Sequence, residues 1–111
     1  MTITVKTIIP RKQAEAAQTA QYTANSVKTI IDKFTVTNTS ALNAVFSCNL
    51  VAAGDVAGVD SLVLDAKTVA PSETYTCPEL VGQTLESGGF ISTLAGTASA
   101  LTISASGREI S

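Results

Sequence analysis

Side chains that commonly perform catalysis are scarce or scattered in this sequence. Histidine is absent, which removes the commonest general base and the usual partner of a serine or cysteine nucleophile. Glycoside hydrolysis needs two paired carboxylates, and nothing in the spacing of the nine carboxylates pairs them. Those expected on loops and strand ends are Asp55, Asp60, Glu73, Glu79 and Glu86. We interpret them as solubilising groups and expect that the protein is not an enzyme.

The two cysteines and the loop aspartates do not form a recognisable metal site. Cys48 and Cys77 lack CxxC spacing, and no histidine could complete a ligand set. Cys48 falls on an apolar strand face, which predicts a small buried hydrophobic side chain. A Cys48–Cys77 disulfide is the alternative, but no signal peptide is recognisable, and a cytoplasm keeps thiols reduced. Asp55 and Asp60 lack the spacing and closing glutamate of a calcium loop, so we expect no metal and no cofactor.

Charge and hydropathy limit the partners that we expect. The formal net charge is −2, whereas binding to phosphate backbones needs a basic face. No apolar run approaches the roughly 20 residues of a membrane helix, so we expect neither nucleic acid nor membrane as a partner. Lys6, Arg11 and Lys12 form the only basic concentration. They belong either to a solvated N-terminal arm or to an inter-subunit contact with an acidic neighbour.

Residues 28–51 contain the clearest pair of strands. Apolar residues alternate over 28–38, which predicts a half-buried strand. This alternation places Ile30, Phe34 and Val36 on one face, opposite Thr29 and Ile31. Asn38-Thr39-Ser40 then predicts a turn in which polar side chains bond the local backbone.

The second run of the pair is also expected to be a strand. One face would carry Ala44, Phe46, Cys48 and Leu50. A helix over 41–51 is the competing interpretation, but helical spacing would scatter the large apolar residues among polar positions.

Further short strands are expected along the rest of the chain, separated by Gly- and Pro-containing turns. They cover 2–9, 18–24 with Tyr22 inward, 61–69, 73–77, a short piece within 80–85, 90–95 and 99–105. In 61–69 we expect Leu62, Leu64 and Ala66 on one face. We expect Gly107 to break the last strand, and residues 108–111 either extend that strand or form a tail. Residues 11–20 predict either an extended arm or one helical turn.

This spacing predicts an all-β protein with one β-sandwich, jelly-roll or Ig-like, of about 7–9 short antiparallel strands and an N-terminal arm. The expected division is 1–20 for the arm, with a possible first strand, and 21–111 for the sandwich. Charged residues make up only 14% of the chain, and few lysines are available to protect edge strands. Pairing between copies would satisfy such edges, so we expect a homo-oligomer.

Three stretches resemble a known family. They are IIDKFTVTNTSA at 30–41, PSETYTCPELVGQTLESGGFISTLA at 71–95 and ALTISASGREI at 100–110. With these stretches the chain resembles short virion structural proteins, about 110 residues long, that are encoded in the structural-gene regions of tailed bacteriophages and prophages. The first 20 residues match least.

The resemblance implies a virion component, assembled in the host bacterial cytoplasm, whose partners are other virion proteins of the capsid, neck or tail. It implies either an accessory protein of the capsid surface, acting as decoration or cement, or a neck or collar protein, and it carries over no catalytic residue. The rival function is a receptor- or carbohydrate-binding module of a tail fibre. Such a module usually offers exposed aromatic side chains, whereas aromatics are only 5% of this chain.

Overall fold

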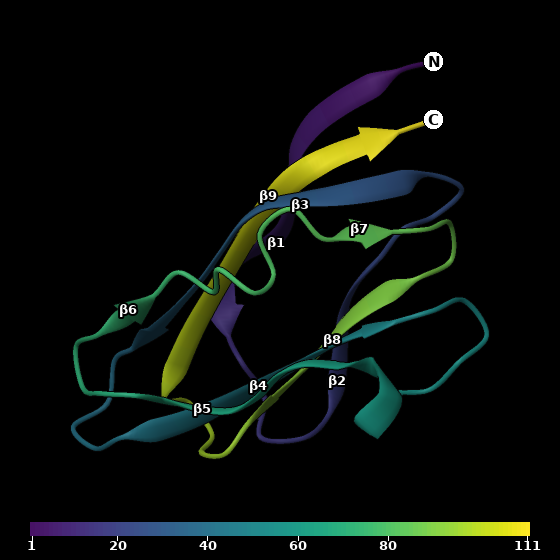
Figure 1. Ribbon diagram of the computed structural model, residues 1–111. Helices are drawn as coiled ribbons and strands as arrows, with labels where there is room; N and C mark the ends of the chain where they lie inside the picture. The colour runs from purple at the N-terminus through teal and green to yellow at the C-terminus, as the bar shows by residue number, and fades with distance from the viewer.

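The computed structural model describes residues 1–111 and consists of β-strands, connecting loops and one 3-10 turn (Figure 1). The elements are β1 (Ile3–Gln13), β2 (Thr19–Thr23), β3 (Lys28–Asn38), β4 (Ala44–Val51), η1 (Val59–Ser61), β5 (Leu62–Val69), β6 (Thr74–Tyr75), β7 (Thr84–Leu85), β8 (Phe90–Ala95) and β9 (Leu101–Ile110).

These strands form two antiparallel sheets, which confirms the predicted all-β sandwich. The first sheet has the order β1-β9-β3-β6, with β7 also paired to β3, and the second has the order β2-β8-β4-β5. Strand pairs are nested along the chain, since β1 pairs with β9, β2 with β8, β3 with β6 and β4 with β5. A long antiparallel ribbon rolled into two sheets has this order, which is that of a jelly roll, and here β6 and β7 both pair with β3 in the five-stranded first sheet.

The predicted faces of β3 are wrong in its first half, because a bulge interrupts the alternation. The pairing register with β9 shifts between Ile31 and Lys33, so Asp32 is an extra residue. Thr29 and Ile31 are therefore buried together with Phe34, while Ile30 is only half-buried and faces outward. A single inserted residue thus moves the polar Thr29 into the interior and Ile30 toward solvent.

Residues 44–51 form strand β4, and the helical alternative is wrong. Ala44, Phe46 and Cys48 are buried in the core, and Leu50 packs against it, so the predicted face is confirmed. The rings of Phe34 and Phe46 meet across the sandwich with centroids 6.0 Å apart and planes inclined by 44°. This contact joins one central strand of each sheet, and aromatic pairs of this geometry add to the stabilisation from area burial.

Two further expectations about strand interiors are wrong. In β5, Leu64 is buried but Ala66 is exposed at φ 51°, because the register with β4 shifts between Phe46 and Cys48. Ala66 is thus the inserted residue of a bulge. Gly107 does not end the last strand, since β9 continues through it to Ile110.

The first 20 residues are mostly strand. β1 is hydrogen-bonded to β9 along its whole length, with irregularities between Thr7 and Ile9 and between Ile9 and Lys12. Residues 11–13 continue this strand and contain no helical turn, and β2 begins at Thr19. The segment predicted as an arm therefore contributes one edge strand of the first sheet and the start of an edge strand of the second.

The turn between the two central strands has the predicted chemistry. The Asn38 side chain is fully buried, and its Oδ1 accepts a 2.8 Å hydrogen bond from the Ser40 backbone N–H. Its Nδ2 donates to the carbonyl oxygens of Leu42 and Val69, each at 2.8 Å. One side chain therefore fixes the turn and attaches it to the end of β5.

Candidate functional site

The feature that stands out on this sandwich is the end that carries both chain termini. β1 and β9 run side by side to this end, which lies at one corner of the molecule (Figure 1). We call residues 3–7 of β1 and 106–110 of β9 the tongue. All five β1 residues of the tongue are exposed, whereas Ile8 and Ile9, which follow directly, are buried. The strand therefore leaves the core at Ile8 while its pairing with β9 continues.

One backbone edge of the tongue has no strand partner. Thr2 and Ser111 exchange backbone hydrogen bonds of 3.0 and 3.1 Å, and the same register pairs Thr4 with Glu109 and Lys6 with Gly107. Backbone groups of successive residues alternate in direction, so the N–H and C=O groups of Ile3, Val5 and Thr7 point away from β9. β1 is the outermost strand of its sheet, and these groups therefore face solvent.

The outer face of the tongue is apolar. Ile103 and Ala105 of β9 are buried, so the alternate positions of that strand, Arg108 and Ile110, face outward. Directly paired residues share a face, which places Ile3, Val5 and Ile30 on the same side as Ile110. We call these four aliphatic residues the outer patch. Ile3 is 52% exposed and Val5 76% exposed, which is unusual for large aliphatic side chains on a strand.

Arg108 lies beside the outer patch, but its charge is paired. Its Nε and Nη2 donate to both carboxylate oxygens of Asp32 at 3.0–3.2 Å. This hydrogen bonding raises the pKa of the Arg108 guanidinium above its ordinary value. The bidentate contact spans β9 and the β3 bulge. The outer patch is therefore bordered by a neutralised ion pair.

A polar network supports the inner side of the tongue. The Tyr22 hydroxyl contacts both the Glu109 carboxylate and the Thr29 hydroxyl, the latter at 2.7 Å. Lys6 Nζ lies 3.5 Å from the other carboxylate oxygen of Glu109. Burial, followed by the hydrogen bond to Glu109, raises the pKa of Tyr22 to about 12. Since Tyr22 comes from β2, this network fastens the tongue to the opposite sheet.

The basic residues singled out in the sequence all lie on β1. Lys6 pairs with Glu109 as described, and Lys12 Nζ lies 2.9 Å from Glu15. Arg11 is exposed and has no ion-pair partner. Two of the three charges are therefore already compensated within the chain, and a role of these residues between subunits stays a prediction.

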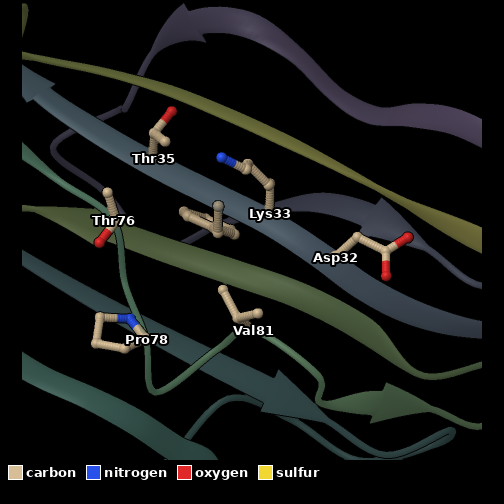
Figure 2. A pocket seen from close by; sticks show the side chains of 7 residues that line it. Asp32, Lys33, Thr35, Thr76, Pro78 and Val81 are labelled. Carbon is tan, nitrogen blue, oxygen red and sulfur yellow. The ribbon is translucent and has the colours of Figure 1, made fainter.

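A groove lies where the loop between β6 and β7 leaves the edge of β3. Pro78 and Val81 of this loop face Lys33 and Thr35 across it (Figure 2). Its volume is about 450 Å³. β6 and β7 pair with β3 on either side of it, at residues 36–37 and 29–30. The lining carries two charged residues, Lys33 and Asp32. The Asp32 carboxylate is bound by Arg108, so it is not a free acid or base in the groove.

Chemically reactive side chains elsewhere in the fold are separated or protected. Cys48 and Cys77 are both fully buried and unbonded to each other, and burial is the main cause that raises the pKa of each thiol, that of Cys77 to about 12. Tyr75 donates to the Glu79 carboxylate at 2.6–2.7 Å, and Lys67 Nζ lies 4.7 Å above the Tyr75 ring. No group of three or more His, Cys, Asp or Glu side chains is arranged to hold a metal ion.

Comparison of the chain with protein-family models, with curated proteins and with solved structures found no match. The fold has no helix with the length and apolar character that crossing a bilayer requires.

Sequence reasoning did not find the outer patch. The alternation of Ile3 and Val5 with threonines is the pattern of any half-buried strand, and nothing in it distinguishes the end that leaves the core. The patch also depends on the β3 bulge, which turns Ile30 outward.

Proposed function

We propose that this protein is a structural component of a tailed-phage virion that acts through protein–protein contacts. Within the particle it would be an accessory protein, placed either on the capsid surface as decoration or cement, or in the neck or collar. The observation that carries the proposal is the tongue, which combines an open backbone edge with exposed aliphatic side chains on a firmly supported end of the sandwich.

The tongue has the properties of a contact surface. An unpaired edge strand offers a row of donors and acceptors to a neighbouring chain, and natural proteins usually protect such edges. Here Pro10 and two irregularities blunt β1 only beyond Thr7. Within the tongue the edge strand carries one charged residue, Lys6, and its charge is paired with Glu109 of the same chain. The jelly roll adds support by fold-level analogy, since this architecture recurs in viral capsid domains.

The resemblance in 30–41, 71–95 and 100–110 supplies the virion context of the proposal. Two of these stretches include most of β3 and all of β9, which are neighbouring strands of the first sheet. The third includes β6, β7 and the loop at the groove, and it ends with β8 of the second sheet. Most strands in the resembling stretches therefore belong to the first sheet, which also contains the tongue.

The test is the protein content of particles purified from a phage or induced prophage that encodes this chain. Quantitative mass spectrometry should detect the chain in many copies per particle, at a fixed ratio to the major capsid or neck protein. Val5→Asp should lower this incorporation, because it places a carboxylate on the exposed face of the tongue. Val56→Asp is the matched control, because Val56 is 77% exposed on a loop away from the tongue. Absence of the chain from washed particles would contradict the proposal.

A further inference from the structure

We propose that the partner of the tongue is the tongue of a second copy of this chain, paired edge to edge across a two-fold axis centred on Val5. This inference deepens the proposed function and rests on its claim that the tongue is a contact surface.

The directions of the free backbone groups select this register. Ile3, Val5 and Thr7 point outward, so an antiparallel partner must place its own outward residues opposite them. A two-fold axis at Val5 sets Val5 against Val5 of the other copy and Ile3 against Thr7. All three outward residues of each copy are then paired, which would form about six backbone hydrogen bonds between the subunits.

Neighbouring registers satisfy fewer groups or bring like charges together. An axis at Lys6 would place two lysine side chains directly opposite each other, which destabilises a strand pair. An axis at Thr4 would leave Thr7 opposite the first residue of the partner, beyond the end of its strand. Pairing between the two copies cannot be extended toward the C-terminal end of β1, because Pro10 has no N–H and β1 is irregular between Thr7 and Lys12. The Val5 register stops before Pro10 in both copies.

Side chains support the same arrangement. Val5 of each copy would contact its equivalent on the outer face, with Ile3 beside it, so that the two outer patches join into one apolar strip. Lys6 would lie on the other face opposite Thr4, and it remains paired with Glu109 of its own chain. The two first sheets would become one continuous sheet through β1, which is the strand-addition mode of recognition.

Cysteine cross-linking tests the register. Val5→Cys should form an inter-subunit disulfide under mild oxidation, because directly opposed residues in an antiparallel pair have Cα separations compatible with a disulfide. Thr7→Cys is the matched control, since it lies on the same face of the same strand but opposite Ile3. Mixing Thr7→Cys with Ile3→Cys should restore cross-linking. The native thiols of Cys48 and Cys77 are buried and should not compete.

Light scattering tests the interface itself. The contact is short, so the dimer should form at high protein concentration, with a mass approaching twice the 11.4 kDa of the chain. Val5→Asp should abolish this dimer by opposing two carboxylates, whereas Val56→Asp should leave it intact. Equal far-ultraviolet circular dichroism spectra of the two variants would show that the fold is unchanged.

Three outcomes would overturn the inference: no cross-link with Val5→Cys at any concentration, equal cross-linking by Thr7→Cys alone, or a dimer that persists in Val5→Asp. These outcomes are separable from failure of the proposed function. A chain that is abundant in particles but does not cross-link through Val5→Cys within them would keep the virion role and refute the two-fold pairing. A chain that cross-links through Val5→Cys as expected but is missing from particles would support the two-fold pairing and refute the virion role.

Discussion

The substitution Gly107→Ala tests whether the bulge in β3 is fixed by close backbone packing against β9. A Cβ atom added at this position would lie 2.3 Å from the carbonyl oxygen of Ile30 and 3.3 Å from its carbonyl carbon. Both obstacles are backbone atoms, so no side chain can rotate away. Gly107→Ala must therefore displace β9 from β3 beside the bulge, and overpacking of this kind typically costs about 1–3 kcal/mol of unfolding free energy.

The loss should be measurable by thermal and urea denaturation followed by far-ultraviolet circular dichroism. For a domain of this length it corresponds to a decrease of the thermal midpoint by roughly 4–15 °C. Gly58→Ala is the matched control, because a Cβ there meets nothing within 4 Å and the backbone is extended. Equal midpoints for Gly107→Ala and the unmodified protein would refute the assignment of the bulge. An equal decrease of the midpoint in Gly58→Ala would refute it as well, because the loss would then not depend on the close contact at Gly107.

Three other predictions concern polar and titratable side chains. Asn38→Ala should lower the unfolding free energy by about 1–3 kcal/mol in urea titrations, since the carbonyls of Leu42 and Val69 lose their donor; an unchanged midpoint would argue against the turn described. The pKa of Tyr22 and that of Tyr75 are both raised from 10 to about 12, so the folded state holds these protons more tightly than the unfolded chain. The unfolding free energy that these raised pKa values contribute should be fully present below about pH 10, and it should decline as the pH rises toward about 12. Urea midpoints measured across that range should therefore fall with pH, and they should fall less in Tyr22→Phe. The thiols of Cys48 and Cys77 should react with a maleimide only after denaturation, and rapid labelling of the native protein would contradict their burial.

The fold class was predictable because it depends on patterns that repeat along the chain. Alternation of apolar residues and regularly spaced turn residues predicted most strands, and Asn38 gave the correct turn chemistry because its side chain bonds only to nearby backbone groups. Burial of Cys48 followed in the same way from its place on an apolar strand face.

The bulges were not predictable from the same patterns. Asp32 and Ala66 are inserted residues, and whether a strand accommodates an extra residue depends on its partner. Gly107 shows this dependence, because its missing side chain makes room for Ile30 on a strand that is distant in the sequence. A glycine read alone predicts a break, whereas a glycine opposite a bulge allows the strand to continue.

The tongue was only partly predictable. The sequence indicates a strand at residues 2–9 and a shortage of lysines at edges, and both observations favour contacts between copies. It does not indicate where β1 leaves the core, since exposure of Ile3 and Val5 is decided by the length of β1 and β9 relative to the second sheet. The tongue could therefore be located only from the three-dimensional structure.

The most direct test of the proposed role is a cryo-electron microscopy reconstruction of particles that contain this chain. We expect jelly-roll density in many symmetry-related copies on the capsid surface or at the neck, with the tongue of each copy buried against another protein chain. Particles without this density, or copies whose tongue points freely into solvent, would contradict the assignment of the tongue as the assembly surface.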